Sequence, residues 1–144
     1  FVPVTPVSFI DRVKDVYPNY EALMYKERKY TWEQVYDRCT QIASALSKLC
    51  VGEGAVVSIM AANTPELFEA HYSIPMTGGV INTINTRLDV RTVAYILDHS
   101  DCKILIVDRQ FQKVASEALT QVDREILVID IDDPHAGLGE VPVI

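Results

Sequence analysis

The stretch NTPELFEAHYSIPMTGGVINTINTRL, residues 63–88, does most to decide the fold of this 144-residue chain. Thr64 as a cap and Pro65 at the first helical position predict a helix start, because proline has no amide hydrogen to lose there. Pro75 must kink or end that helix, since it removes a backbone hydrogen bond. A glycine pair follows, and then residues 80–83, which predict a strand. The stretch therefore holds one helix-to-strand unit of an α/β fold.

The same alternation continues on both sides of this stretch. Residues 55–60 (AVVSIM) are a near-continuous apolar run, which is typical of a strand covered on both faces. Residues 103–107 (KILIV) and 126–129 repeat that pattern, and Asp89 and Asp108 are predicted to cap the intervening helices. We expect the inner faces of these helices to carry Val93, Ile96 and Leu97, and then Phe111, Val114, Ala118 and Val122. The order predicts an α/β fold, a mainly parallel sheet flanked by helices and joined by right-handed crossovers.

The first thirty residues predict smaller elements. Apolar residues at helical spacing over 9–16 indicate a short amphipathic helix that ends before Pro18. Residues 21–25 and 29–30 are predicted to be two short strands around the polar turn 26–28. The N-terminal part is therefore expected to be a helix followed by a hairpin.

A long helix is predicted to follow. Thr31 and Gln34 match a capping box, in which the hydroxyl accepts from the third helical amide and the glutamine side chain reaches back. Gly52 is predicted to supply the left-handed stop. One apolar face is expected to carry Val35, Cys39, Ile42, Leu46 and Leu49.

We expect residues 1–144 to be a single α/β segment. Its parts are a helix and hairpin over 1–30, alternating helices and strands over 31–130, and an irregular acidic loop over 131–144. The chain starts without methionine, and its last residues, 140–144 (EVPVI), are apolar and form no finished element. We therefore expect it to be one part of a longer protein.

Composition bounds the class of protein. The chain is 49% hydrophobic and 23% charged, which is typical of a globular domain, and no apolar run is long enough to cross a bilayer. A net charge of −7 without a basic stripe argues against nucleic acid as a partner. Cys39, Cys50 and Cys102 lie far apart without a C-x-x-C pair, which predicts reduced, largely buried thiols rather than disulfides or a zinc site.

Several motifs of known chemistry are missing from the sequence. No G-x-G-x-x-G follows strand 55–60 and no Walker loop occurs, so a nucleotide-binding Rossmann module is disfavoured. No G-x-S-x-G elbow occurs either, which disfavours a hydrolase triad. Asp108 and Asp130 follow strands, and we interpret them as capping and loop residues. The acidic group Asp130, Asp132, Asp133 and His135 is interpreted as a solvated turn rather than a cation site, because its spacing misses the calcium-loop pattern.

Five side chains remain as candidates for a substrate-side or interface network: His71, Asn82, Asn85, Thr86 and Arg87. His71 is interpreted as a hydrogen-bonded helix residue rather than a catalytic base. The other four have two interpretations. They form a polar network that ties a strand end to the following helix, with Arg87 pairing a carboxylate, or they border a substrate or subunit surface. We favour the first interpretation, and the second stays open.

A set of short pieces resembles one family. They are TPVSF at 5–9, YTWEQ at 30–34, GEGAVVSI at 52–59 with NTP at 63–65, and PMTGGVIN at 75–82 leading into NTRL at 85–88, followed by His99-Ser100 and Val107-Asp108. Together they resemble the N-terminal part of the adenylate-forming acyl-CoA synthetases, in particular the plant-type acyl-activating enzymes that use benzoate, cinnamate or short- and medium-chain acids. Ala62 departs from the proline that is usual there.

The resemblance implies that the full-length protein is an AMP-forming acyl-CoA ligase that uses ATP, Mg²⁺, coenzyme A and a small carboxylic acid, in the cytoplasm or the peroxisome. In the family, a Ser/Thr/Gly-rich phosphate loop and a lysine of a C-terminal domain do the chemistry, and neither motif occurs in residues 1–144. This segment is therefore expected to be scaffold that binds no cofactor alone, with the remainder of the same polypeptide as its partner. The alternative is a free-standing, non-catalytic α/β binding module.

Overall fold

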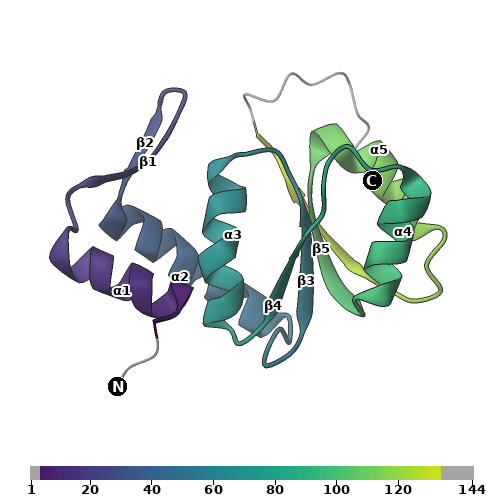
Figure 1. Cartoon of the computed structure of the whole chain (residues 1–144), viewed down its shortest axis with the longest axis horizontal. Helices are drawn as coiled ribbons and strands as arrows, with labels where there is room; N and C mark the ends of the chain where they lie inside the picture. Colours follow the sequence, from purple (N-terminus) through teal and green to yellow (C-terminus); the bar gives the residue numbers. More distant parts are fainter. Residues whose placement is uncertain (1–3, 134–144) are drawn as a thin grey trace. The chain divides into compact units, whose positions relative to one another are not determined.

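The computed structural model describes residues 4–133 (Figure 1). They belong to two compact units, each assembled from two stretches of sequence. We call them the hairpin unit (Phe1–Gly54 with Asn63–Val80) and the sheet unit (Ala55–Ala62 with Ile81–Ile144). The predicted acidic loop and the apolar end of the chain lie largely outside the described residues. The predicted division of a single α/β segment into residues 1–30, 31–130 and 131–144 stays a prediction.

The hairpin unit contains three helices and a two-stranded antiparallel hairpin. In chain order these are α1 (Pro6–Val16), β1 (Glu21–Tyr25), β2 (Arg28–Thr31), α2 (Trp32–Lys48) and α3 (Pro65–Met76). Figure 1 shows the hairpin as a narrow ribbon that leads into α2. The predicted helix, hairpin and long helix are therefore all present, with α1 and β2 slightly longer than predicted.

Side-chain caps explain where α1 and α2 begin. The Thr31 hydroxyl accepts from the Gln34 amide at 3.3 Å, and the Gln34 side chain accepts from the Thr31 amide at 2.9 Å. This confirms the predicted capping box. A second box joins Thr5 and Ser8 at the start of α1. Each box satisfies amide groups that a helix leaves without partners at its first turn.

The end of α2 differs from the prediction. Cys50, with φ +62°, takes the left-handed conformation that was assigned to Gly52. The Cys50 amide donates to the Ser47 carbonyl and the Val51 amide donates to the Leu46 carbonyl, both at 3.1 Å, which is the Schellman pattern. Leu46 and Val51 are both buried. Because this apolar pair is buried, α2 ends two residues earlier than predicted. The free energy gained by the burial outweighs the backbone strain at Cys50, which has a Cβ.

Helix α3 ends as its proline requires, since Pro75 is its last residue but one. The chain then turns through Gly78, whose φ is +81°. A Cβ on Gly78 would lie 3.3 Å from the Cα of Glu53, so backbone proximity as well as conformation favours glycine there. The core beneath α3 joins fully buried and partly buried side chains: Ile10, Val35 and Cys39, with Ala22, Leu23, Tyr30, Tyr36, Phe68, Tyr72 and Met76.

The sheet unit is built on a four-stranded sheet in the order β4-β3-β5-β6. The strands are β3 (Val56–Met60), β4 (Val80–Thr83), β5 (Cys102–Asp108) and β6 (Leu127–Ile131). Strand β5 is parallel to both β3 and β6, which confirms the predicted mainly parallel α/β sheet. Strand β5 is buried along most of its length, as expected for a central parallel strand.

Two helices, α4 (Val90–His99) and α5 (Gln112–Leu119), pack on each other and on β5 (Figure 1). Asp89 caps α4 as predicted, accepting from the Thr92 amide at 2.9 Å. Asp108 instead caps a short 3₁₀ turn, η1 (Arg109–Phe111), by accepting from the Gln110 amide, and α5 starts after it. The predicted face is therefore divided between η1, α5 and the turn after α5, but its four residues all pack on the core as expected: Phe111, Val114, Ala118 and Val122. The hydrophobic core of this unit contains the buried side chains of Met60, Ile84, Val93, Ala94, Leu97, Cys102, Leu105, Val107, Ala115, Ala118 and Ile126.

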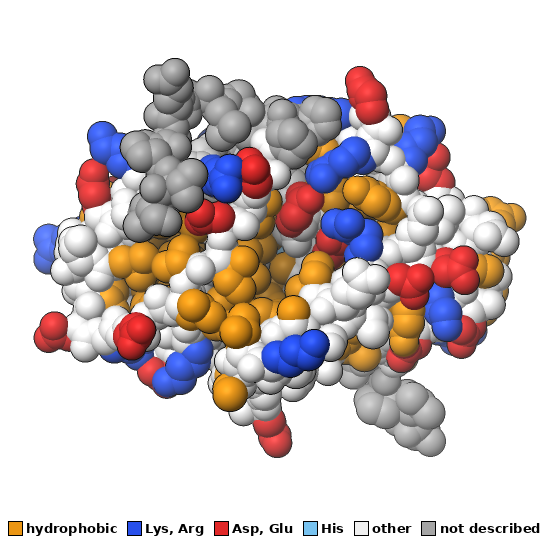
Figure 2. Space-filling model, turned by 180° about the vertical axis from the view of Figure 1, so that it is seen from behind, with side chains coloured by type: hydrophobic (Ala, Val, Ile, Leu, Met, Phe, Trp, Pro, Cys, Tyr) orange, Lys and Arg blue, Asp and Glu red, His pale blue; other side chains and the backbone are white. Residues whose placement is uncertain are grey.

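Apolar side chains are also exposed on the surface. Leu127 and Val128 of β6, at one end of the strand order, are 46% and 39% exposed. In Figure 2, groups of hydrophobic side chains lie between charged ones on the surface that the view shows. Contiguous apolar surface of this kind usually meets another protein surface. Within residues 4–133, no helix has the length and apolar character needed to cross a bilayer.

Candidate functional site

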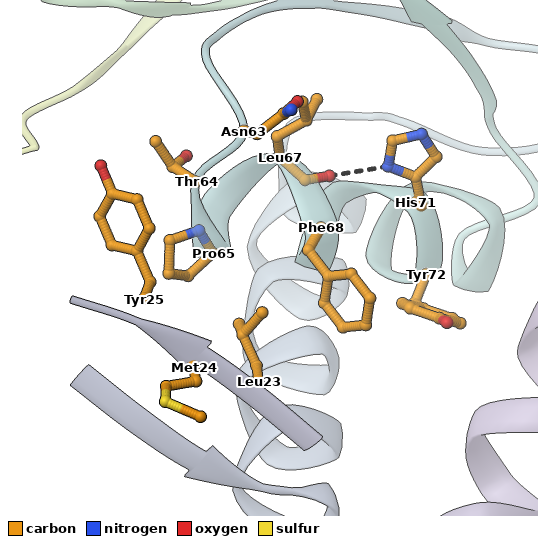
Figure 3. A pocket seen from close by; sticks show the side chains of 10 residues that line it. All are labelled: Leu23, Met24, Tyr25, Asn63, Thr64, Pro65, Leu67, Phe68, His71 and Tyr72. Atoms are coloured by element: carbon orange, nitrogen blue, oxygen red, sulfur yellow. Dashed lines mark hydrogen bonds between the residues drawn. The ribbon is translucent and has the colours of Figure 1, made fainter. Parts of the chain in front are cut away.

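The hairpin unit contains a pocket of about 500 Å³ between the hairpin and the first two turns of α3 (Figure 3). The volume lies within the range of small-molecule sites, about 300–1,000 Å³. Ten residues line the pocket, three from β1 and seven from α3 and its start: Leu23, Met24, Tyr25, Asn63, Thr64, Pro65, Leu67, Phe68, His71 and Tyr72. None of them carries a carboxylate, ammonium or guanidinium group.

Helical periodicity explains this lining. Phe68 and Tyr72 are four residues apart, so their rings lie on one side of α3 and meet edge to face, with centroids 5.3 Å apart. Leu67 and His71 form a second pair at the same spacing. Figure 3 shows Leu23 and Met24 of the hairpin across from Phe68. The walls are therefore mainly aromatic and aliphatic.

His71 is one of the polar residues that line the pocket, with Asn63 and Thr64. Its Nδ1 lies 2.8 Å from the Leu67 carbonyl oxygen, and the side chain is exposed (Figure 3). A carbonyl oxygen can only accept, so Nδ1 must carry the hydrogen. The structure thus places His71 as a hydrogen-bonded helix residue, in agreement with the favoured interpretation. When the ring is neutral, Nε2 is left as a hydrogen-bond acceptor.

One arginine–glutamate pair lies beside the pocket. Arg28 of β2 donates to both carboxylate oxygens of Glu66, at 3.0 and 3.4 Å. Burial would raise the pKa of Glu66, but the hydrogen bonds from Arg28, the Glu66 backbone and Thr64, with the charge of Arg28, together outweigh it, and the pKa is lowered. The Arg28 guanidinium and the Lys26 ammonium also lie 5.2 and 5.3 Å from the centre of the Tyr25 ring. This edge of the unit is held by charge and aromatic contacts together.

A second pair joins α2 to α3. Glu69 is fully buried and accepts two hydrogen bonds from Arg38, which lies over the Tyr30 ring. Burial raises the pKa of Glu69, and Arg38 opposes that shift. Burial also raises the pKa of the neighbouring Cys39 thiol to about 12, so this thiol is not a reactive nucleophile.

The three cysteines are free thiols, as predicted. Cys39 and Cys102 are buried, but Cys50 is exposed, because it occupies the left-handed position that ends α2. The prediction of buried thiols is therefore wrong for Cys50.

Asn82 is placed in the sheet unit at the centre of a polar network. Its amide nitrogen donates to the hydroxyl of Ser58 on β3 at 3.0 Å and lies 3.4 Å from the hydroxyl of Ser100, the residue that ends α4. Ser58 is fully buried, so this bond satisfies a hydroxyl that has no access to water. The geometry agrees with the interpretation that Asn82 ties a strand to the following helix.

Asn85, Thr86 and Arg87 form a turn between β4 and α4. The Asn85 side chain accepts from the Arg87 amide at 3.0 Å, and the Leu88 amide donates to the Asn85 carbonyl at 3.2 Å. Asn85 and Arg87 are exposed, and Thr86 is half-buried. Among residues 4–133, no carboxylate pairs with Arg87. The expected ion pair is therefore not found there, because the turn directs this residue to the surface.

The candidate acidic residues have separate roles. Asp108 is buried and accepts from the amide and the side chain of Gln110, which confirms the capping interpretation. Asp132 pairs with Arg109 at 2.8 Å. The part of the chain that the structure describes contains no group of three or more potential metal ligands. His135 lies outside the described residues.

The structure separates the candidates that the sequence grouped together. His71 belongs to the hairpin unit, whereas Asn82, Asn85, Thr86 and Arg87 belong to the sheet unit. The pocket around Leu23, Met24 and Phe68 was not predicted. Its sequence signal is weak, because these residues match ordinary hairpin and helix packing.

The fold agrees with comparisons to known proteins. The structure of the anthranilate CoA ligase AuaEII in complex with anthranoyl-AMP matches with a TM-score of 0.83 and 25% identity over 90% of this chain and 26% of that chain. A benzoate CoA ligase from Burkholderia xenovorans LB400 matches in fold, with a TM-score of 0.82 and 21% identity over 90% of this chain and 26% of that chain. The architecture is thus that of the N-terminal region of adenylate-forming ligases.

The sequence comparisons define the family. The family described as "AMP-binding enzyme" matches residues 10–141, and the chain belongs to this family. Two Arabidopsis thaliana relatives are butyrate–CoA ligase AAE11, peroxisomal (43% identical over 91% of this chain), and benzoate–CoA ligase, peroxisomal (45% over 86%). The chain spans 24% and 21% of the length of these two relatives.

Proposed function

We propose that these residues are the N-terminal part of an AMP-forming acid–thiol ligase. In the proposed reaction, a carboxylate oxygen attacks the α-phosphate of ATP, which forms an acyl-adenylate and releases pyrophosphate. The coenzyme A thiolate then attacks the acyl carbon, and AMP leaves. The observation that carries the proposal is the match of 43–45% identity to two curated CoA ligases over most of this chain.

The proposed role of this segment is scaffolding. Two anions meet in the first step, so cations and oriented dipoles are needed to offset their repulsion. Residues 4–133 contain no group of three or more potential metal ligands. We therefore assign ATP, Mg²⁺, coenzyme A and the carboxylic acid to sites formed with the remainder of the same polypeptide. That remainder is also the proposed cover for exposed Leu127 and Val128.

An adenylation assay tests both parts of the proposal. The full-length protein should release pyrophosphate and form acyl-CoA from butyrate or benzoate, in a reaction that needs ATP and coenzyme A. Residues 1–144 alone should form no adenylate above the buffer rate. Turnover by the isolated segment would contradict the scaffold role, whereas a full-length protein inactive on a broad panel of acids would contradict the ligase assignment.

Arg87 is proposed to border the substrate side of the enzyme. Its guanidinium is exposed on a turn that the Asn85 side chain orders, and both ATP and coenzyme A are polyanions. Replacing Arg87 by Ala should raise the KM for one of them about 10-fold, the loss expected for one charged hydrogen bond. The matched control is Arg91→Ala on α4, also exposed, which should change KM less than about 2-fold. Equal changes in KM for Arg87→Ala and Arg91→Ala would contradict the proposal that Arg87 borders the substrate side.

The proposed compartment is the peroxisome or the cytoplasm. Several relatives carry the word peroxisomal in their names. Imaging a fluorescent fusion that keeps the natural C-terminus free distinguishes the two, because a terminal Ser-Lys-Leu-type signal is read only at that end.

A further inference from the structure

The sheet unit has a hollow of about 370 Å³ that is lined by α5, β5 and the outer strand β6. Its apolar walls come from Ala115 and Leu119 of α5, Val107 of β5 and Val128 of β6. The hollow therefore offers hydrocarbon surface on several sides. The other lining residues are polar: Gln112, Ser116 and Asp130.

The hollow lies where the helical layer on this face of the sheet ends. In the parallel register, Leu105 and Val107 of β5 lie opposite Val128 and Asp130 of β6, so these side chains share one face. On β5 that face packs on α4 and α5, and both residues are fully buried. On β6, Val128 is 39% exposed and Asp130 is exposed as well. Since parallel sheets are normally covered by helices, one more helix is expected beside α5.

Two polar groups of the lining have no partner among residues 4–133, and both are acceptors. Gln112 is 4% exposed, and its buried Oε1 accepts no hydrogen bond there. Such an acceptor costs free energy, so it usually has a donor in the complete protein. The Asp130 carboxylate forms no ion pair with the described cations. The group that fills the hollow is therefore expected to donate hydrogen bonds and to carry a positive charge.

A lysine or arginine side chain matches both parts of this lining. Each has an apolar stem that packs on hydrocarbon and a cationic head with several donors. Residues 101–133 carry eight Asp/Glu against four Lys/Arg, so a second copy of this chain would bring a like-charged surface to the hollow. The proposed full-length protein can supply the cation itself, because the chain spans only 24% and 21% of its two curated relatives.

We propose that a helix from the remainder of the same polypeptide packs beside α5, over β6, and inserts a lysine or arginine into this hollow. Its stem packs on Leu119 and Val128, and its cationic head donates to Asp130 and Gln112. The inference rests on the proposed function, since it requires the longer polypeptide, and it names the surface by which that polypeptide attaches to the sheet unit.

Hydroxyl-radical footprinting of the full-length protein tests the proposal, because it measures how accessible each side chain is to solvent. The readout is the oxidation rate of Val128, determined by peptide mass spectrometry in the native and in the urea-unfolded protein. We expect native Val128 to be oxidised at least about 10-fold more slowly, as for a residue in a packed interface. This protection should be unchanged on dilution, because the covering helix belongs to the same chain.

Variants of Asp130 test the expected cation. Asp130→Asn removes the negative charge and should raise the oxidation rate of Val128 about 2- to 10-fold, the effect of one charged hydrogen bond. Asp130→Glu keeps the charge and should change the rate less than about 2-fold. Asp123→Asn is the matched control, at another exposed carboxylate without an ion pair among residues 4–133, and should leave the rate unchanged.

Gln112→Leu tests the buried acceptor. If Oε1 has a donor in the full-length protein, the variant leaves that donor unpaired and should raise the Val128 rate about 2- to 10-fold. If Oε1 has no donor there, its removal leaves the rate unchanged or lowers it, and the proposal is contradicted.

Three further results would overturn the proposal. Val128 could be slowed only in proportion to its 39% exposure, which would mean that the hollow is open. Its protection could be lost on dilution, which would assign the cover to a second copy. Asp130→Asn and Asp123→Asn could have equal effects, which would exclude the cation. An active ligase with freely oxidised Val128 contradicts this inference alone, whereas a protected Val128 in an inactive protein contradicts the ligase assignment alone.

Discussion

The hairpin unit and the sheet unit hold their helices by different means. In the hairpin unit, Arg28–Glu66 and Arg38–Glu69 attach α3 to the hairpin and to α2, and the Glu69 carboxylate is fully buried. In the sheet unit, α4 and α5 pack on β5 through a hydrocarbon core. Its Arg124–Asp101 pair lies at the surface, where ion pairs contribute little. One unit therefore depends on specific polar pairs, and the other mainly on apolar burial.

The largest effect is expected from the sheet core. Leu105 of β5 is fully buried, and Leu105→Ala should lower the free energy of unfolding by about 2–5 kcal/mol, through lost burial and the cavity left behind. Urea unfolding of the variant measures this loss, and hydrogen exchange should show it in β3, β5 and β6. Leu127→Ala, at a half-exposed position, is the control and should cost less than about 1 kcal/mol. Equal losses would mean that apolar burial does not dominate this unit.

The next effect tests the hairpin unit. Glu69→Ala should cost about 2 kcal/mol, below the range for a fully buried pair, because the Arg38 side chain is 37% exposed and can be partly hydrated. Replacing both Arg38 and Glu69 by Met should cost less than Glu69→Ala, since no charge is then left without its partner. Hydrogen exchange in α2 and α3 measures both changes. A double variant less stable than the single one would contradict the importance of pairing.

A smaller effect is expected at the polar network of the sheet unit. Asn82→Ala removes the partner of the buried Ser58 hydroxyl and should cost about 1–2 kcal/mol. Asn85→Ala, in the exposed turn, should cost less than about 1 kcal/mol. Thermal unfolding of the two variants tests this order. A larger loss of stability in Asn85→Ala than in Asn82→Ala would mean that the turn contributes more to stability than the polar network.

The smallest effect is the pH dependence of the hairpin unit. The pKa of Glu66 is below its ordinary value of 4.5, so the unfolded chain binds the proton more tightly than the folded one. Its stabilisation is present above pH 4.5 and is lost as the pH falls through the folded pKa. Glu66→Gln should therefore flatten the acid limb of the stability curve, measured by melting temperature between about pH 3 and 6. The pKa of Glu69 is raised, so Glu69 changes stability with pH in the opposite direction. If the acid limb of the stability curve is unchanged in Glu66→Gln, Glu66 is not the group that causes it.

Local sequence signals predicted most element types correctly. The Thr31–Gln34 box, the Asp89 cap and the apolar runs of β3 and β5 each depend on residues within a few positions of each other. The signals failed where packing competes with local preference. The stop of α2 falls on Cys50 rather than Gly52, because Leu46 and Val51 are buried together.

The candidate site was predicted less completely than the fold. The sequence singled out His71 and the Asn82–Arg87 region as residues needing partners, but it did not reveal that they belong to different units. It also gave no sign that β1 and α3 line a pocket, because Leu23, Met24 and Phe68 match the pattern of ordinary packing.

By itself, the sequence determined the helices, the strands, their caps and the family, since these follow from backbone geometry over a few residues and from short motifs in a fixed order. The tertiary structure alone decided the pairs Arg28–Glu66 and Asn82–Ser58, which are 38 and 24 residues apart, and the pocket beside His71. The physical reason is that contacts between distant residues depend on how whole elements pack, which local periodicity does not encode.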